Sequence, residues 1–280
     1  MRQKFKDIQT MNGHIVSVYR NTITQYPSRA PFHPSKYPEY IFGSNNLSEQ
    51  HNVAYESVRS VFHLSGLDYR NFGTPIWNPL KELIHPGQTI LLKPNLIKEM
   101  HPSFSDGWQW ILTNGAIIRA VADYVWKALG GEGKVIVADA PQTDSSFDKI
   151  VEVLALDQIK EFYLDQDLDF ELIDLRQEEW KTQDGVVTSK KSLHGDPNGT
   201  VSFDLGDCSE FVGHNGGGRY YGADYDAQEV NRHHRDGRHE YLVAASAIKS
   251  DVIFNLPKLK THKKAGITVS LKNLVGVTAD

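Results

Sequence analysis

The stretch that decides the fold is DVIFNLPKLKTHKKAGITVSLKNLVG, residues 251–276. Residues 251–256 form a short apolar and β-branched run, which is typical of a buried strand. Pro257 follows, and because proline cannot donate to a sheet ladder, we expect the strand to end there. Gly266 permits a sharp turn, and the apolar spacing after it predicts an amphipathic helix over residues 267–275.

Basic residues crowd the expected loop between this strand and this helix, and no Asp or Glu occurs from 254 to 279. The loop and the helix carry Lys258, Lys260, His262, Lys263, Lys264, Lys272 and Asn273. A basic loop before a helix N-terminus can bind an anion, because backbone N–H groups are unpaired there. A solvated charged loop is the alternative. The alternation of lysines with Leu259 directly after a buried strand favours the anion site.

The composition limits the class of protein. The chain has 280 residues, of which 40% are hydrophobic, and a net charge of −5. The acidic balance argues against a general nucleic-acid binder. The N-terminus has no apolar core of a signal peptide and no stretch approaches the length of a membrane span, so we expect a cytoplasmic protein. Cys208 is the single cysteine, which excludes an intrachain disulfide and any cysteine-ligated zinc or iron–sulfur site within one chain.

Two further apolar runs, residues 89–93 and 134–139, are followed by Pro94 and by Ala140-Pro141. Helices are expected after them, one over 116–129 capped by Thr113 or Asn114, and one capped by Asp144 or Ser145. Continuously apolar strands that alternate with helices predict a parallel sheet with helices on both faces. The fold class is therefore α/β, as a single domain over residues 1–280 with an irregular polar insertion at about 177–238.

Several weaker patterns predict additional elements. They are a strand at 14–20, a helix at 48–64 capped by Ser48, a strand at 170–175, a hairpin formed by 186–188 and 201–205, and a helix at 240–250.

Polar residues follow all three apolar strands, and parallel strands place their carboxyl ends at one edge of the sheet, where ligands bind in open α/β folds. We therefore expect the side-chain ends of Lys93, Asp139, Lys258 and His262 to lie within about 12 Å of one another around one pocket. The expected catalytic residues are Asp139 and His262, either of which could handle a proton. The expected substrate-binding residues are Lys93, Asn95, Lys258, Lys260, Lys272 and Asn273.

Histidines are frequent late in the chain and lie among carboxylates: His214, His233, His234, His239 and His262, with Asp224, Asp226 and Glu229. This composition would suit a divalent metal. However, His233 and His234 are adjacent and cannot point the same way on a regular element, and no HExxH spacing is present. We predict surface histidines and no metal site. The glycines of 215–219 are interpreted as a linker, with an anion-binding nest as the alternative.

Three strings closely resemble the domain-of-unknown-function 362 family. They are LLKPNL (91–96), VIVADAP (135–141) and the stretch 251–276 quoted above. YYGADYDAQEVNRHH (220–234) is similar to the branch whose genes lie among cell-surface polysaccharide loci. The family has no settled activity, so the resemblance implies relatives rather than a reaction. Some relatives carry ferredoxin-type cysteine repeats, which this chain lacks. Similar proteins continue past the KNLVG motif, so we expect Asp280 to be a truncation point.

The sequence thus favours an enzyme that acts on an anionic small molecule, phosphorylated or carboxylated. The alternative is a non-catalytic anion- or partner-binding module in a surface-polysaccharide or envelope pathway. A titratable group with a perturbed pKa that faces the lysines inside a closed pocket would favour the enzyme, whereas an open, flat basic face would suit the binding module. The sequence identifies no cofactor and no protein partner.

Overall fold

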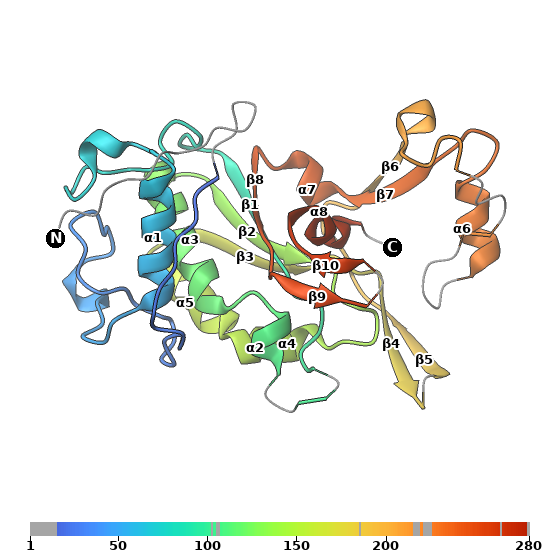
Figure 1. The fold of residues 1–280 in the computed structure, drawn as a ribbon, viewed down its shortest axis with the longest axis horizontal. Coiled ribbons are helices and arrows are strands. Elements are labelled where there is room, and N and C mark those ends of the chain that lie inside the picture. The colour runs from blue at the N-terminus through green and yellow to red at the C-terminus, as the bar shows by residue number, and fades with distance from the viewer. Residues whose placement is uncertain are drawn as a thin grey trace.

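The computed structural model describes residues 16–101, 103–104, 107–184, 186–214, 219–220, 226–263 and 265–278. At its centre lies a four-stranded sheet with strand order β3-β2-β1-β8 (Figure 1). All three strand pairs are parallel, and Leu91 lies between Ile136 and Ile253 in the register. The predicted α/β fold with a parallel sheet is therefore confirmed. The strands are β1 (Thr89–Pro94), β2 (Lys134–Asp139), β3 (Asp169–Asp174) and β8 (Val252–Leu256).

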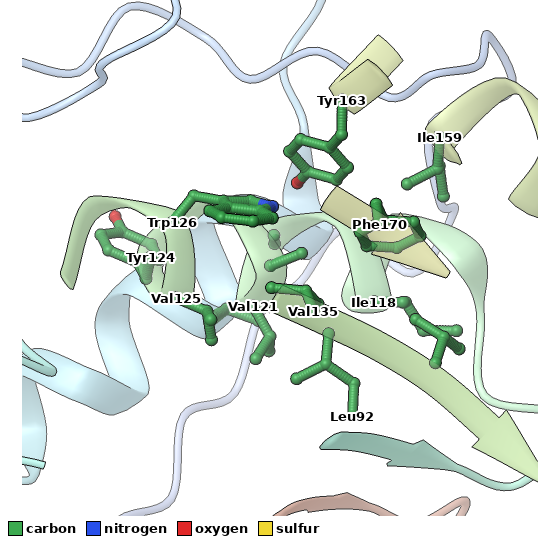
Figure 2. Close-up of a cluster of buried hydrophobic side chains, with 14 of the residues drawn as sticks. Leu92, Ile118, Val121, Tyr124, Val125, Trp126, Val135, Ile159, Tyr163 and Phe170 are labelled. Atoms are coloured by element: carbon green, nitrogen blue, oxygen red, sulfur yellow. The ribbon is translucent and has the colours of Figure 1, made fainter. Parts of the chain in front are cut away.

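The apolar runs of β1 and β2 are continuous because both faces of these strands are buried. Ile90 and Leu92 point into the larger hydrophobic core, whereas Leu91 between them belongs to a smaller core on the other face. Figure 2 shows side chains of α3 (Gly115–Leu129) close to Leu92 and Val135 in the larger core. The period-two alternation therefore divides each strand between two cores.

Most helices around the larger core begin at a side-chain cap. The Asn114 side chain caps α3, as one of the two predicted residues, and Gly130 ends this helix with a φ of 64°. The predicted cap of the next helix was wrong, because Ser146 accepts from the N–H of Lys149 at the start of α4. The other helices of this layer are α1 (Val53–Leu64), α4 (Phe147–Leu154) and α5 (Leu156–Leu164).

Two N-terminal predictions were wrong. Helix α1 begins after Asn52 rather than Ser48, because the Asn52 side chain caps the N–H of Tyr55 and also donates to Phe32 O. No strand is present in residues 16–20, where Val16 and Val18 are 77% and 80% exposed. Positions 14–15 lie outside the described residues. An alternating pattern makes a strand only where a neighbouring edge is available for pairing.

The region after β3 forms small antiparallel ribbons rather than the predicted hairpin. β5 (Val186–Ser192) pairs with β4 (Glu178–Gln183), where Trp180 is buried, and β6 (Thr200–Asp204) pairs with β7 (Glu240–Ala244). The first half of the predicted helix at 240–250 is therefore a strand, and only α7 (Ala245–Lys249) is helical. Partners far apart in the chain decide these pairings, and local sequence does not encode them. The β6–β7 ribbon and α6 (Ala227–His233) extend away from the sheet (Figure 1).

The segment after β8 begins with a two-stranded hairpin. β9 (Lys260–His262) pairs with β10 (Gly266–Thr268), and Thr268 lies opposite Lys260. The helix predicted over 267–275 was wrong in its first part, because the β-branched residues there are extended and Thr268 is buried. Helix α8 (Ser270–Asn273) and the 3-10 turn η4 (Leu274–Val277) follow.

The remaining described helices are short. They are α2 (Trp108–Ile111) and the 3-10 turns η1 (Ser44–Asn46), η2 (Tyr69–Asn71) and η3 (Gly206–Cys208). Within the described ranges, no helix has the length and apolar character needed to cross a bilayer.

Candidate functional site

A buried ion pair joins the carboxyl ends of the two central strands. Lys93 Nζ lies 2.7 Å from Asp139 Oδ1, and the two side chains are 0% and 5% exposed. Asp139 Oδ2 accepts a hydrogen bond of 2.6 Å from the N–H of Leu96. Burial raises the pKa of Asp139, and the Lys93 charge and these hydrogen bonds oppose that rise. Both oxygens of the carboxylate therefore have protein partners.

The α8–η4 segment closes over this pair. Asn273 Nδ2 donates to Lys93 O at 2.9 Å and to Asn255 Oδ1 at 2.7 Å, which links α8 to β1 and β8. Gly276 O accepts from the N–H of Ala140 at 2.8 Å. A Cβ at Gly276 would lie 2.9 Å from Lys93 Nζ and would overlap Asp139 Oδ1 outright. Only glycine fits this approach, so the KNLVG sequence caps the edge of the sheet.

Lys260 lies above the same edge and is half-buried. Its Nζ donates to Asn95 Oδ1 at 3.0 Å and to Ile111 O at 2.7 Å. Asn95 is itself held in place, because its N–H donates to Thr113 Oγ1, which in turn donates to Leu256 O. The Lys260 amine is thus fixed by groups that follow β1 and by α2.

Burial lowers the pKa of Lys260 to about 8, and the positive charges of Lys272 and Lys258 contribute in the same direction. Asp139 acts in the opposite direction, with an effect on the Lys260 pKa larger than that of Lys258. Burial also lowers the pKa of Lys258. Among the residues that the structure describes, no ion pair joins Lys258, Lys260 or Lys272 to a carboxylate. This trio is named the lysine cluster below.

His262 lies two residues after Lys260 on β9, so both residues belong to the same face of that strand. The Nδ1 atom of His262 accepts from the N–H of Ala265 at 3.0 Å. This hydrogen bond places the proton of the neutral ring on Nε2, which makes that nitrogen a donor.

The predicted site residues therefore divide into two layers. Lys93, Asp139 and Asn273 form a buried layer in which they bind one another. Asn95 joins the outer layer through Lys260, which lies with Lys258 and Lys272. The expectation that His262 shares one pocket with Lys93, Asp139 and Lys258 stays a prediction.

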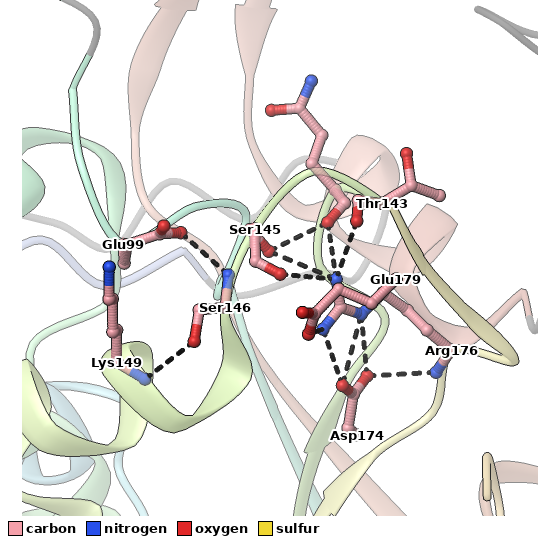
Figure 3. Close-up of polar contacts among 9 residues, drawn as sticks. Glu99, Thr143, Ser145, Ser146, Lys149, Asp174, Arg176 and Glu179 are labelled. Atoms are coloured by element: carbon pink, nitrogen blue, oxygen red, sulfur yellow. Dashed lines mark hydrogen bonds and ion pairs between the residues drawn. The ribbon is translucent and has the colours of Figure 1, made fainter. Parts of the chain in front are cut away.

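Sequence reasoning missed Arg176, which is 4% exposed and braces the loop after β2. Its Nη1 donates to Gln142 O and to Ser145 O, each at 2.8 Å, and its Nη2 pairs with Asp174 at 2.7 Å (Figure 3). The loop begins directly after Asp139, so Arg176 fixes the path of the backbone as it leaves the sheet after that residue. Arg176 follows the strand predicted at 170–175, and applying the strand-end argument to this fourth strand would have found it.

The late histidines pack mainly against aromatic rings and one another. His234 and His239 approach through their Nδ1 atoms at 3.4 Å and lie against Phe211, whereas His233 pairs with Glu240 at 2.7 Å. Among the residues with described positions, no group of three or more His, Cys, Asp or Glu side chains is arranged to hold a metal ion. Asp224 and the glycines of 215–218 lie outside the described residues.

Comparison with known proteins gives one finding. No curated protein and no solved structure matches the chain significantly. Residues 209–280 match the family model described as "Domain of unknown function (DUF362)", and this segment contains the lysine cluster and the cap of the sheet edge. Over residues 209–280 the match confirms the resemblance to the DUF362 family that the sequence predicted.

Proposed function

We propose that the chain is an enzyme that acts on an anionic small molecule, phosphorylated or carboxylated, at the carboxyl edge of its parallel sheet. The observation that carries this proposal is the lysine cluster. Lys258 and Lys272 both lie within electrostatic reach of Lys260, and the described residues supply none of the three with a carboxylate in an ion pair.

Electrostatics explains why such a cluster favours an anion. Uncompensated like charges repel one another, and the repulsion contributes to the lowered pKa of Lys260. A bound phosphate or carboxylate would supply the missing negative charge, and lysine suits phosphate as a point charge. Asp139, the carboxylate that acts on Lys260, is already paired with Lys93.

The two layers receive different roles in this proposal. Lys258 and Lys272 bind the anionic group, and Asn95 orients the amine of Lys260. His262 Nε2–H is the candidate proton donor near this face of β9. Lys93, Asp139 and Asn273 are positioning residues, because their functional atoms bind one another and tie α8 to the strands. The lowered pKa of Lys260 favours an enzyme over a simple binding module.

A non-catalytic partner-binding module in a surface-polysaccharide or envelope pathway is the second candidate. The observation in its favour is the apolar surface beside the lysines, where Leu271 is 88% exposed and Leu259 is 68% exposed. A partner surface would use these side chains together with the basic charge. A cytoplasmic location for the protein is likewise a proposal.

Thermal unfolding with a panel of small molecules tests the proposal. The panel holds inorganic phosphate, sugar phosphates, nucleotides, small carboxylates and the neutral sugars that match them. A ligand at a hundredfold excess over its Kd stabilises the native state by about 2.7 kcal/mol. Concentration-dependent stabilisation by the anions, without stabilisation by the neutral sugars, supports the anion site on which the proposal rests. Equal responses to both groups, or none to either, would contradict the proposal.

A further inference from the structure

The partners of the half-buried Lys260 Nζ differ from those of the fully buried Lys93 Nζ. Lys93 Nζ faces a carboxylate at 2.7 Å, whereas the Lys260 acceptors are an amide oxygen and a backbone carbonyl. Both acceptors are neutral. A neutral amine has two N–H groups, which these two acceptors satisfy, and its lone pair is then left for another partner.

The surroundings of Lys260 also disfavour its ammonium form. After burial, the charged groups that act on it are, in order of effect, Lys272, which disfavours the proton, Asp139, which favours it, and Lys258, which disfavours it. Burial acts in the same direction as the two lysines. At a pKa of about 8, roughly one amine in ten is unprotonated at pH 7, compared with about one in several thousand for an ordinary lysine. Desolvation and neighbouring cations are the means by which proteins activate lysine nucleophiles.

We infer that Lys260 is the nucleophile of the proposed enzyme and forms an imine with an aldehyde or ketone that also carries a phosphate or carboxylate. This inference rests on the proposed function and narrows its substrate class to anionic carbonyl compounds. Lys258 and Lys272 hold the anionic group, and Asn95 Oδ1 and Ile111 O hold the amine in position.

The step is balanced without an oxidant or a reductant. The lone pair of Lys260 Nζ attacks the carbonyl carbon and a C–N bond forms, while the π pair of the carbonyl moves to its oxygen. That oxygen takes up the two amine protons and leaves as water as the C=N bond forms. The positive charge that develops on a protonated imine makes it an electron sink for bonds next to the former carbonyl carbon.

Reductive trapping tests the inference on the full chain. The probe is pyridoxal 5′-phosphate, an aldehyde that carries a phosphate, with sodium cyanoborohydride added to reduce any imine to a stable amine. Pyridoxal, which lacks the phosphate, is the matched probe. Intact mass and peptide mapping locate the label. We expect Lys260 to be labelled at least about tenfold faster than the exposed Lys263, and faster by the phosphorylated probe than by pyridoxal.

Two variants sharpen the readout. Lys260→Arg keeps the positive charge but has no amine, so fast labelling should disappear, whereas Lys263→Arg should leave it unchanged. Labelling spread evenly over exposed lysines, or absent from Lys260 in the native chain, would overturn the inference. Inorganic phosphate binding to the native chain, measured by calorimetry, separates this failure from that of the proposed function. If phosphate binds and Lys260 is not labelled, only the nucleophile assignment fails.

Discussion

Replacing Asp139 by asparagine removes the negative charge from a buried ion pair while keeping the size of the side chain. Lys93 then retains a positive charge with no exposed surface, and its remaining acceptors are Pro94 O and Asn273 Oδ1 at 2.9 and 3.5 Å. Removing one partner of a buried pair costs about 3–5 kcal/mol. The asparagine oxygen can still accept from Leu96 N–H, so we expect a loss of about 3 kcal/mol in the free energy of unfolding. Urea titration followed by circular dichroism measures it.

The matched control is Asp144→Asn, which breaks the pair with Lys98 in the loop after the same strand. Those side chains are 26% and 27% exposed, so the pair is worth at most about 1 kcal/mol. Combining Asp139→Asn with Lys93→Met should recover part of the lost stability, because the unpaired charge is gone. If Asp139→Asn costs no more than Asp144→Asn, the buried pair does not hold the sheet edge together and the reasoning is refuted.

Three further changes test neighbouring parts of the account. Gly276→Ala should lower the unfolding free energy by about 2 kcal/mol or more, because its Cβ would overlap Asp139 Oδ1. The control Val275→Ala, at an exposed position, should lower it by about 0.5 kcal/mol or less. Arg176→Met should cost about 1–3 kcal/mol by removing the Arg176 donor from Ser145 O and the ion-pair partner from Asp174, and an unchanged urea midpoint would disprove that bracing role. Lys260→Met removes a group whose pKa of about 8 lies below the ordinary value of 10.5, so from about pH 8 to 10.5 the unfolded chain binds more protons at this position than the folded chain. The unfolding free energy of the native chain should therefore rise with pH in this window relative to that of the variant. A difference between the two that stays constant with pH would contradict the lowered pKa.

The central sheet could be predicted because its determinants are local. The strands around Leu91, Ile136 and Phe254 are apolar runs with a proline at or soon after the end of each, and buried parallel strands need no alternation. The cap of α3 at Asn114 is equally local. The β6–β7 pairing could not be predicted, because residues 200–204 meet residues 240–244 only after the chain has folded around them.

The candidate site likewise has a part that the sequence could predict and a part that it could not. The strand-end argument places Lys93 and Asp139 at one edge, and their ion pair agrees with that placement. Sequence alone could not show that Asn273 and Gly276 would close over the pair and turn it into a buried layer. The closure of α8 over the ion pair depends on the extended backbone at 266–268. This backbone takes the place of the first part of the predicted helix, so α8 begins only at Ser270, near the strand ends.

The central claim is that the lysine cluster binds an anion. Titration of the native chain with inorganic phosphate by isothermal calorimetry, alongside Lys258→Ala and Lys263→Ala, tests it most directly, because both variants remove one positive charge from the same segment. We expect Lys258→Ala to raise the Kd at least about tenfold, equivalent to about 1.4 kcal/mol. We expect it to change the unfolding free energy by no more than about 0.5 kcal/mol. Lys263→Ala should leave the Kd within about twofold of the native value. Equal affinities for the two variants would contradict the anion site.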